Sequence, residues 1–435
     1  MPLDFSHVEP DPSWSFRDCT PRETAYITHC YHRYPAKFIP QVAARLIREH
    51  SEPGDVVLDP FMGSGTTLVE ALVAERRARG VDLNPAALIA SKAKTTPIEP
   101  GRLFSALRDF QERLSWLDEE RRGPTLFPPP EPILPADRER LNWWFPRPQQ
   151  QRLGTILAII EATPDPALRG FLRCAFSHTL KTASYWLMKS SKPTRDKKKL
   201  AGGVPDPVRP LMRHLWKMQR ANVLFWHTLP ERFRRRPEAA ADIRCGDARA
   251  LPWKARSTDL VVTSPPYVTS YEYAALHELT TLWLAPLTDI PDAKAPFIGS
   301  AAARGRGEAE PNSALARQIV AQLRLRSQTK AEEVRQYFLD MQDAFREVRR
   351  VLKPGGKVCD VIGNTALERV PILNAEVHAE ILQNLGFELA HVVRRIIPLK
   401  TLPQVRDPRS GKFTSDKSAA VHAYPEEFIL IARKP

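Results

Sequence analysis

A short apolar run that leads into an aspartate and a glycine-rich loop constrains the fold of this chain more than any other feature. Residues 56–58 have the composition of a strand, the loop covers 59–65, and a helix is expected over 67–77. Residues 80–82 then form a second candidate strand. Strand, loop, helix and strand in this order make a βαβ unit, whose two strands are parallel. The pattern therefore predicts an α/β fold built on a parallel sheet.

The sheet pattern resumes near residue 243, where a further strand begins. Additional strands are expected at 259–263, 357–362, 387–398 and 427–433. Apolar residues spaced three and four apart predict an amphipathic helix over 334–352, which a Lys-Pro-Gly-Gly sequence ends. The stretch 286–330 is rich in Pro, Ala, Gly and Arg, and we expect it to be a long loop.

Residues 101–240 separate the two halves of this sheet pattern. They are expected to be mostly helical, except for a proline-rich segment at 124–135 that favours an extended chain. A length of 435 residues suits two or three domains. We therefore expect a catalytic α/β domain made of 1–100 and 241–435, and a helical, basic inserted domain over 101–240.

The positive charge of the chain is concentrated in the second half of this insertion. The formal net charge is +14, and residues 181–236 contain fifteen Lys and Arg against three Asp and Glu. Aromatic residues lie among these cations, a mixture that suits a polyanion with stackable bases. A solvated helical face above an aromatic core is the alternative. The candidate DNA-binding residues are Lys192, Arg195, Lys197, Lys198, Lys199, Arg234, Arg235 and Arg236.

Composition also narrows the class of protein. The sequence has no apolar run of membrane-helix length and no signal-like start, so a cytoplasmic protein without a membrane partner is expected. The five cysteines are scattered without a Cys-x-x-Cys pair, which favours reduced thiols and predicts no metal site.

The loop after the first strand has the composition of a ligand-binding turn. Its sequence, Asp59-Pro-Phe-Met-Gly-Ser-Gly-Thr-Thr67, lets the chain turn tightly and exposes backbone N–H groups at a helix start. Asp82, at the end of the next strand, is placed to hold ribose hydroxyls. No lysine follows the last glycine, which excludes a P-loop, and the third glycine of a dinucleotide site is missing.

A second loop, Thr263-Ser-Pro-Pro-Tyr267, follows the strand at 259–263. Two consecutive prolines make a rigid turn and remove two N–H donors, so its carbonyl oxygens are free to accept hydrogen bonds from an amino group. Tyr267 adds an aromatic face. The alternative is an ordinary proline-rich turn whose tyrosine packs on the core.

Together the two loops resemble those of S-adenosylmethionine-dependent DNA methyltransferases that act on exocyclic amino groups. Asp-Pro-Phe-x-Gly-Ser-Gly-Thr-Thr and Ser-Pro-Pro-Tyr are similar to the cofactor and catalytic motifs of this family, and Ser264 is typical of its N4-cytosine branch. Two further segments, 34–38 and 246–248, also resemble family motifs. The likeness covers roughly 29–95 and 243–433 and says little about 101–240.

This resemblance implies a Rossmann-like class I methyltransferase sheet with helices on both faces, and S-adenosylmethionine as cofactor. Asp82 would bind the ribose, and Asp247 with Ala248 would touch the adenine. The methionine part of the cofactor would be surrounded by Asp59, Phe61, Gly63, Ser64, Gly65 and Thr66, with Lys37 and Phe38 holding its carboxylate.

The expected chemistry is methyl transfer to the N4 amino group of a cytosine that has swung out of the DNA duplex. The Ser264 hydroxyl and the Pro265 carbonyl would accept hydrogen bonds from the amino group, Pro266 would keep the turn rigid, and Tyr267 would stack on the base. No Pro-Cys dipeptide is present, so a thiol-based C5-cytosine mechanism has no candidate nucleophile.

Two alternatives stay open at this point. One is an amino methyltransferase that acts on adenine N6 or on a base in RNA, because related loops serve those substrates. The other is a nucleic-acid-binding scaffold without catalysis. The resemblance also admits a role as the modification enzyme of a restriction–modification system, with a cognate restriction endonuclease as partner.

Overall fold

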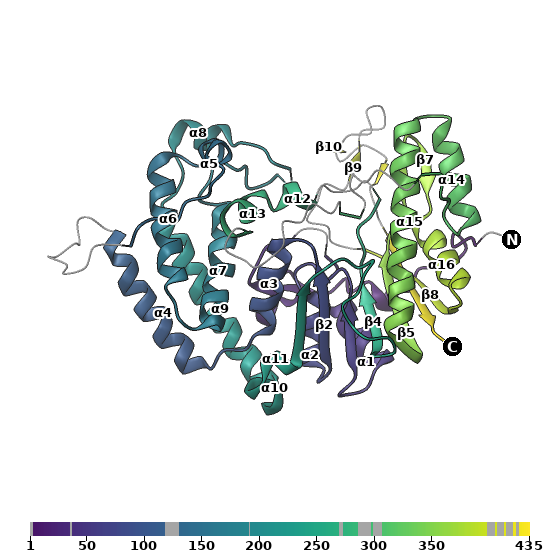
Figure 1. The fold of residues 1–435 in the computed structure, drawn as a ribbon, viewed down its shortest axis with the longest axis horizontal. Helices are drawn as coiled ribbons and strands as arrows, with labels where there is room; N and C mark the ends of the chain where they lie inside the picture. The colour runs from purple at the N-terminus through teal and green to yellow at the C-terminus, as the bar shows by residue number, and fades with distance from the viewer. Residues whose placement is uncertain are drawn as a thin grey trace.

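The computed structural model describes residues 3–34, 37–117, 130–190, 192–268, 273–285, 297–298, 307–397, 405–406, 413–414, 421–422 and 426–435. These residues form a part built on a β-sheet and a part built from helices, which lie side by side (Figure 1). Among the described helices, none combines the length and the apolar character needed to cross a membrane.

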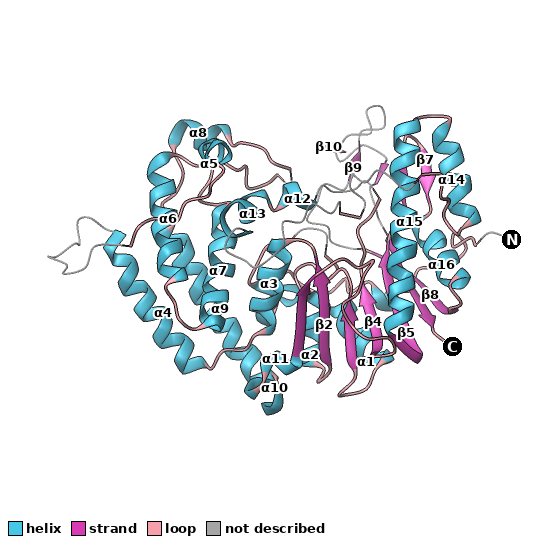
Figure 2. Cartoon of the chain, viewed as in Figure 1, coloured by secondary structure: helices cyan, strands magenta, loops and turns pink. Residues whose placement is uncertain are grey.

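A seven-stranded sheet forms the centre of the first part (Figure 2). In spatial order it contains β3 (Ala241–Cys245), β2 (Arg77–Asp82), β1 (Val56–Asp59), β4 (Thr258–Thr263), β5 (Leu352–Ile362), β12 (Glu426–Arg433) and β8 (Glu388–Ile396). The pairs from β3 to β5 are parallel, and β12 runs antiparallel to both of its neighbours. This order confirms the predicted Rossmann-like class I methyltransferase sheet.

Helices cover both faces of the sheet because side chains alternate between the faces along each strand. Val57 packs with helices α1 (Pro40–His50) and α2 (Thr66–Val73), whereas its neighbour Leu58 packs on the other side with α14 (Ala314–Arg324) and α15 (Gln328–Val351). Helix α3 (Pro85–Thr95) contributes to the first layer, and α16 (Asn374–Asn384) covers β8 and β12.

The helical part has a core of its own. It is built by α4 (Pro100–Leu114), α5 (Arg138–Trp144), α6 (Arg147–Glu161), α7 (Pro166–Leu180), α9 (Val208–Thr228) and α13 (Glu278–Leu284). Helix α13 belongs to this core although it lies outside the 101–240 insertion. Conversely, Phe225 and Phe233 belong to the insertion but pack in the core next to the sheet. The two parts therefore exchange elements across the expected boundaries.

The remaining elements are short. They are 3-10 helices η1 (Pro12–Trp14), η2 (Glu23–Ala25), η3 (Ile27–Cys30) and η4 (Ser115–Leu117); helices α8 (Lys197–Gly202), α10 (Glu231–Arg235), α11 (Pro237–Ala240) and α12 (Tyr273–Leu276); and strands β6 (Thr365–Leu367), β7 (Val370–Ile372), β9 (Val405–Arg406), β10 (Phe413–Thr414) and β11 (Val421–His422).

The structure corrects the prediction of one long loop over 286–330. Helix α14 lies within it, and α15 begins at Gln328. The Ser313 hydroxyl accepts a hydrogen bond from the Ala316 N–H at 2.9 Å and so caps α14. Buried residues recur along the helix at spacings of one helical turn, a pattern masked in the sequence by the many alanines and arginines. Of the predicted loop, 286–296 and 299–306 lie outside the described residues.

Smaller differences concern element ends. Helix α2 stops at Val73 rather than near residue 77, because Arg77 already belongs to β2. Residues 353–356, predicted as a helix stop, are included in β5. Within the predicted extended segment 124–135, the described residues 130–135 adopt neither helix nor strand.

Candidate active site

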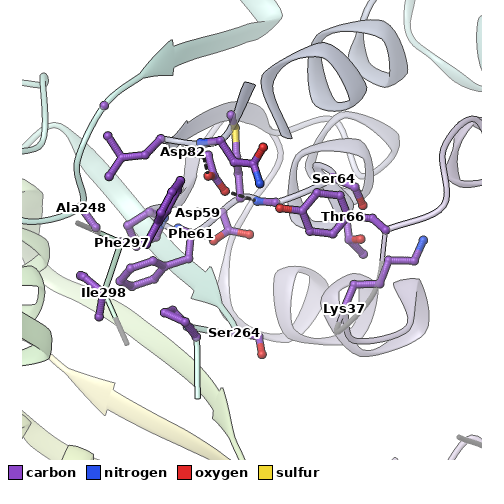
Figure 3. Close-up of a pocket in the computed structure, with 18 of the residues that line it drawn as sticks. Lys37, Asp59, Phe61, Ser64, Thr66, Asp82, Ala248, Ser264, Phe297 and Ile298 are labelled. Atoms are coloured by element: carbon purple, nitrogen blue, oxygen red, sulfur yellow. Dashed lines mark hydrogen bonds between the residues drawn. The ribbon is translucent and has the colours of Figure 1, made fainter. Parts of the chain in front are cut away.

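A pocket lies at the carboxyl ends of β1, β2, β3 and β4, where the loops that follow these strands meet (Figure 3). The chain runs from β1 outward to β2 on one side and reaches β4 and β5 on the other, so the strand order reverses between β1 and β4. In open parallel sheets, ligands bind at such reversal points. The position alone thus marks this pocket as the primary candidate site.

Nearly all residues predicted to hold the cofactor line this pocket. They are Lys37, Phe38, Asp59, Phe61, Gly63, Ser64, Thr66, Asp82, Asp247 and Ala248. Gly65 is the exception, because it lies behind the loop with φ +75°, where an added Cβ would stand 2.9 Å from the Cβ of Ser91. Gly65 therefore shapes the turn that presents Ser64 and Thr66.

Asp59 connects the glycine loop to the catalytic loop. Its Oδ1 accepts a hydrogen bond from the Thr263 hydroxyl at 2.7 Å and another from the Phe61 N–H at 3.0 Å. The carboxylate is buried, and this burial raises its pKa to about 6. Asp59 thereby joins the ends of β1 and β4 on one side of the pocket.

Asp82 organises the next loop in the same way. Its two carboxylate oxygens accept hydrogen bonds from the Gly63 N–H at 3.0 Å and from the Asn84 N–H at 2.8 Å. Burial raises the pKa of Asp82 to about 6 as well. Asn84 in turn caps α3 by accepting from the Ala86 N–H at 2.9 Å. The ends of β1 and β2 are therefore held together by a carboxylate that also faces the pocket.

Two lysines stand beside the glycine loop. Lys94 is completely buried, and its Nζ donates to the Ser64 carbonyl at 2.9 Å. Burial and the neighbouring Lys37 hold the pKa of Lys94 well below its usual range, and burial lowers the pKa of Lys37 to about 8. Among the described residues, Lys37 and the thiols of Cys30 and Cys174 are the charged or ionisable groups that shift the pKa of Lys94.

The lysines and the hydroxyls beside them form a site suited to an anion. Ser64 Oγ and Thr66 Oγ1 are buried at the pocket and have no hydrogen-bond partner among the described residues. Buried cations and unpaired hydroxyls cost free energy unless a ligand satisfies them. A carboxylate group bound at this end of the pocket would satisfy both.

The catalytic loop divides between the pocket and the core. Ser264 and Pro266 line the pocket, whereas Pro265 is buried behind them. Tyr267 is half-buried and packs against the cluster around Ile362 and Phe428; an added Cβ on Gly363 would stand 3.1 Å from its hydroxyl oxygen. Tyr267 does not line the cofactor pocket, which leaves its ring outside the group of residues predicted to hold the cofactor.

The pocket also includes residues that sequence reasoning did not select. They are Tyr34, Pro60, Met62, Leu83, Asn84, Gly246, Phe297 and Ile298. Tyr34 and Gly246 belong to segments already noted as motif-like, which was an available signal. Phe297 and Ile298 come from the stretch predicted as a loop, and only the fold brings them over the pocket, beside Phe61 (Figure 3). Lys94 had one signal, a lysine on an otherwise apolar helix face.

The predicted DNA-binding residues fall into two separate groups. Residues 234–236 lie at α10 and α11, directly before β3, and therefore at the amino edge of the parallel strands, opposite the pocket. Lys192, Lys197 and Lys198 are exposed around α8, at the top of the helical part in Figure 1. The structure does not bring the two groups together.

Lys199 is a structural residue in its surroundings. Its Nζ donates to four backbone carbonyls, those of Ser184 at 2.7 Å, Trp186 at 3.0 Å, Lys181 at 3.1 Å and Thr182 at 3.2 Å. An ammonium group engaged in this way has no N–H left for a phosphate. Lys199 thus fastens α8 to the loop at 181–186, an arrangement that argues against the predicted contact with DNA.

Comparisons with known proteins agree with the site. The N6_N4_Mtase family of DNA methylases matches residues 5–92. A protein from Kocuria varians named Type II methyltransferase M.MvaI is 27% identical over 404 residues, which cover 88% of this chain and 87% of that protein. The DNA adenine methyltransferase YhdJ of Escherichia coli is 34% identical over 84 residues, 19% of this chain and 27% of that protein.

These similarities support a DNA methyltransferase. They support S-adenosylmethionine as its cofactor and do not distinguish a cytosine enzyme from an adenine enzyme. A S-adenosylmethionine-dependent methyltransferase structure from Methanosarcina mazei overlaps 93% of this chain and 98% of its own, with 11% identity and a TM-score of 0.31.

The role of Lys199 predicts a clear stability difference between two adjacent lysines. Lys199→Met is expected to lower the free energy of unfolding by about 1–3 kcal/mol, because several carbonyls lose a charged donor. Lys198→Met, at an exposed position, should change it by less than about 0.5 kcal/mol. Urea unfolding followed by circular dichroism measures both, and equal stabilities would contradict this role.

The buried carboxylates of the pocket predict how cofactor affinity depends on pH. Asp59 and Asp82 lose their charge as the pH falls through about 6, where exposed aspartates are still ionised. Affinity for the S-adenosylmethionine cation should therefore fall about tenfold or more between pH 7 and pH 5. Isothermal titration calorimetry measures this fall, which should be smaller for S-adenosylhomocysteine because its sulfur is uncharged. Constant affinity for the cation down to pH 5 in folded protein would refute the prediction.

Proposed function

We propose that this protein is a site-specific DNA methyltransferase that moves a methyl group from S-adenosylmethionine to the exocyclic N4 amino group of cytosine. The observation that carries the proposal is the shared pocket of the glycine loop and the Ser-Pro-Pro-Tyr loop. Ser264 and Gly63 lie on the same cavity because β1 and β4 are neighbours in the sheet.

The charges around the pocket support a specific orientation of the cofactor. The methionine carboxylate is assigned to the end formed by Lys37, Ser64 and Thr66, where the hydroxyls lack partners. The ribose is assigned to Asp82, and the adenine to Asp247 and Ala248. The sulfonium then lies towards Asp59, whose negative charge favours a cation. A cofactor held in this way would present its methyl group towards Ser264, which lines the same pocket.

Transfer requires that the lone pair of the amino nitrogen be localised. In the proposed mechanism, the Ser264 hydroxyl and the Pro265 carbonyl accept hydrogen bonds from the two N–H groups. The nitrogen lone pair then attacks the methyl carbon as the carbon–sulfur bond breaks, and its electrons remain on the sulfur of S-adenosylhomocysteine. The nitrogen afterwards releases one proton to solvent. Holding the two reactants in the right geometry can lower the activation free energy of such a transfer by about 7–11 kcal/mol.

The substrate base must leave the duplex to reach this pocket, because a paired amino group lies inside the double helix. Tyr267 is proposed to stack on the extruded base from outside the cofactor pocket. Exposed cations around α8 are proposed to bind the phosphates. A cognate restriction endonuclease would be the natural partner if the enzyme protects host DNA, and the named type II relative supports this setting.

Adenine N6 is the second candidate target. The similarity to a protein named as a DNA adenine methyltransferase, 34% identical over 84 residues, favours this target. Ser264 favours cytosine, because adenine enzymes more often carry Asp or Asn at this position. Two further alternatives are methylation of a base in RNA and a nucleic-acid-binding scaffold without catalysis. The transfer assay described next distinguishes both from the proposed function.

Methyl transfer from tritiated S-adenosylmethionine to DNA and to RNA, followed by nucleoside digestion, tests the proposal. Label is expected in N4-methylcytosine of DNA. Label in N6-methyladenine would overturn the assignment of cytosine as the target base, and label in RNA alone would overturn the assignment of DNA as the substrate. No label in either polymer would support a nucleic-acid-binding scaffold without catalysis.

Substitution of the catalytic serine should separate chemistry from binding. Ser264→Ala is expected to lower the transfer rate at least 100-fold, because the amino group loses a positioned acceptor. Affinity for S-adenosylhomocysteine, measured by calorimetry, should change less than threefold. Transfer at the wild-type rate would exclude the role proposed for Ser264.

The buried lysine behind the glycine loop predicts a difference between two cofactor fragments. Lys94→Met should weaken S-adenosylhomocysteine about tenfold, because a bound carboxylate favours the protonated form of Lys94 and the variant has no ammonium group to supply this charge. It should leave 5′-methylthioadenosine, which lacks the carboxylate, nearly unchanged. Lys92→Met, an exposed position on the same helix, is the control. Equal losses for both ligands would show that Lys94 only supports the fold.

A further inference from the structure

An exposed tryptophan stands beside a basic loop on the helical part. Trp143, near the end of α5, is 55% exposed, whereas the next residue, Trp144, is buried. Arg195 lies with its guanidinium carbon 4.4 Å from the centre of the Trp143 ring and 5.1 Å from that of Tyr185. The three side chains thus form an aromatic–guanidinium stack, in which Trp143 comes from α5 and the other two come from one loop.

We propose that this stack of Trp143, Arg195 and Tyr185 contacts a base of the DNA substrate. This inference rests on the proposed function and identifies a surface of the helical part that binds the DNA. An indole ring with an open face stacks on a base whose own face is exposed, as in a nucleotide that has left the duplex stack, and a guanidinium together with lysines neutralises adjacent phosphates.

Arg195 is held in place by the two aromatic rings. Its guanidinium lies over both of them, and its Nε is buried without a hydrogen-bond partner among the described residues. Lys192, Lys197 and Lys198 are exposed near it along the chain. The only acid in this stretch, Asp196, accepts from the Lys198 N–H at 2.9 Å and caps α8.

The stack is supported by a rigid base. Trp144 and Trp186 stack below it with ring centres 4.8 Å apart. The Tyr185 N–H donates to the Trp144 carbonyl at 2.9 Å, and the loop is closed by a β-bridge between Trp186 and Arg195. Lys199 fastens the same loop from the other side. Little conformational entropy remains to be lost when a ligand binds, which favours recognition.

The stack lies on the side of the molecule that carries the catalytic loop. The indole Nε1 of Trp144 donates to a carboxylate oxygen of Glu278 at 3.2 Å, and Arg140 lies 4.0 Å from the same carboxylate. Glu278 is the first residue of α13, shortly after the catalytic loop. Figure 1 shows α5 and α8 at the same edge of the molecule as α12, whereas α10 and α11 lie at the opposite edge.

The fold contains a matched pair for comparison. Arg234 lies 5.6 Å from the ring centre of Trp226, on α10 and α9, at the amino edge of the sheet. This pair has the same chemistry as Trp143 with Arg195 but faces away from the catalytic loop. A nonspecific effect of removing a surface tryptophan would appear at both positions, whereas a DNA contact would appear only at Trp143.

The experiment measures affinity of the full-length protein for a fluorescent DNA duplex that carries the site methylated in the transfer assay, at several salt concentrations. Trp143→Ala is expected to weaken binding about tenfold with an unchanged salt slope, because a stacking contact releases no counterions. Trp143→Phe should restore most of the affinity. Lys197→Ala should lower the salt slope by about one ion, and Trp226→Ala should bind as the wild type does.

Other results would overturn the inference. Wild-type affinity of Trp143→Ala, or an equal loss in Trp226→Ala, would remove the stack from the interface. A loss seen with an RNA hairpin but not with the duplex would assign it to another polymer. Trp143→Ala could lose affinity because it is less stable, which a lower melting temperature than that of the wild type would reveal. In that case Trp143→Phe decides the question, and a Trp143→Phe protein that still binds DNA weakly would count against stacking. Wild-type protein that methylates no DNA would instead refute the proposed function.

Discussion

The hydrogen bond between Thr263 and Asp59 joins the two halves of the site. The residues are far apart in the chain, and each ends one of two adjacent parallel strands, so the bond holds the catalytic loop against the glycine loop. Asp82 extends the same arrangement by accepting from Gly63 in one loop and Asn84 in the next. Three loops thus take their relative positions from two carboxylates.

These carboxylates are stabilising as hydrogen-bond acceptors and costly as buried charges. The desolvation of these charges raises the pKa values of Asp59 and Asp82. Desolvation likewise lowers the pKa values of Lys37 and Lys94, at the other end of the pocket. Such groups are retained at functional sites, where a bound ligand offsets the desolvation of both. A zwitterionic and cationic cofactor matches this distribution of charge.

The helical part contributes in a different way. Its core includes α13, which follows the catalytic loop, and Trp144 reaches across to Glu278 at the start of that helix. The surface around α5 and α8 is therefore positioned relative to the catalytic loop by packing and hydrogen bonding. The cations of 234–236, although close to this surface in sequence, are carried to the far edge because they precede β3.

The sequence by itself determined the sheet, the two loops and the helix between β4 and β5, because these depend on local signals: apolar runs, glycine and proline positions, and helical periodicity. It also marked twelve of the residues that line the pocket, ten in the predicted cofactor set and two, Ser264 and Pro266, in the catalytic loop. Only the tertiary structure decided that Phe297 and Ile298 join this site and that Lys94 donates to the Ser64 carbonyl. It also decided that Tyr267 packs beside Gly363 and that the Lys199 ammonium binds backbone carbonyls. Charge and aromaticity are visible in a sequence, but the direction in which a side chain points depends on which distant segments pack around it.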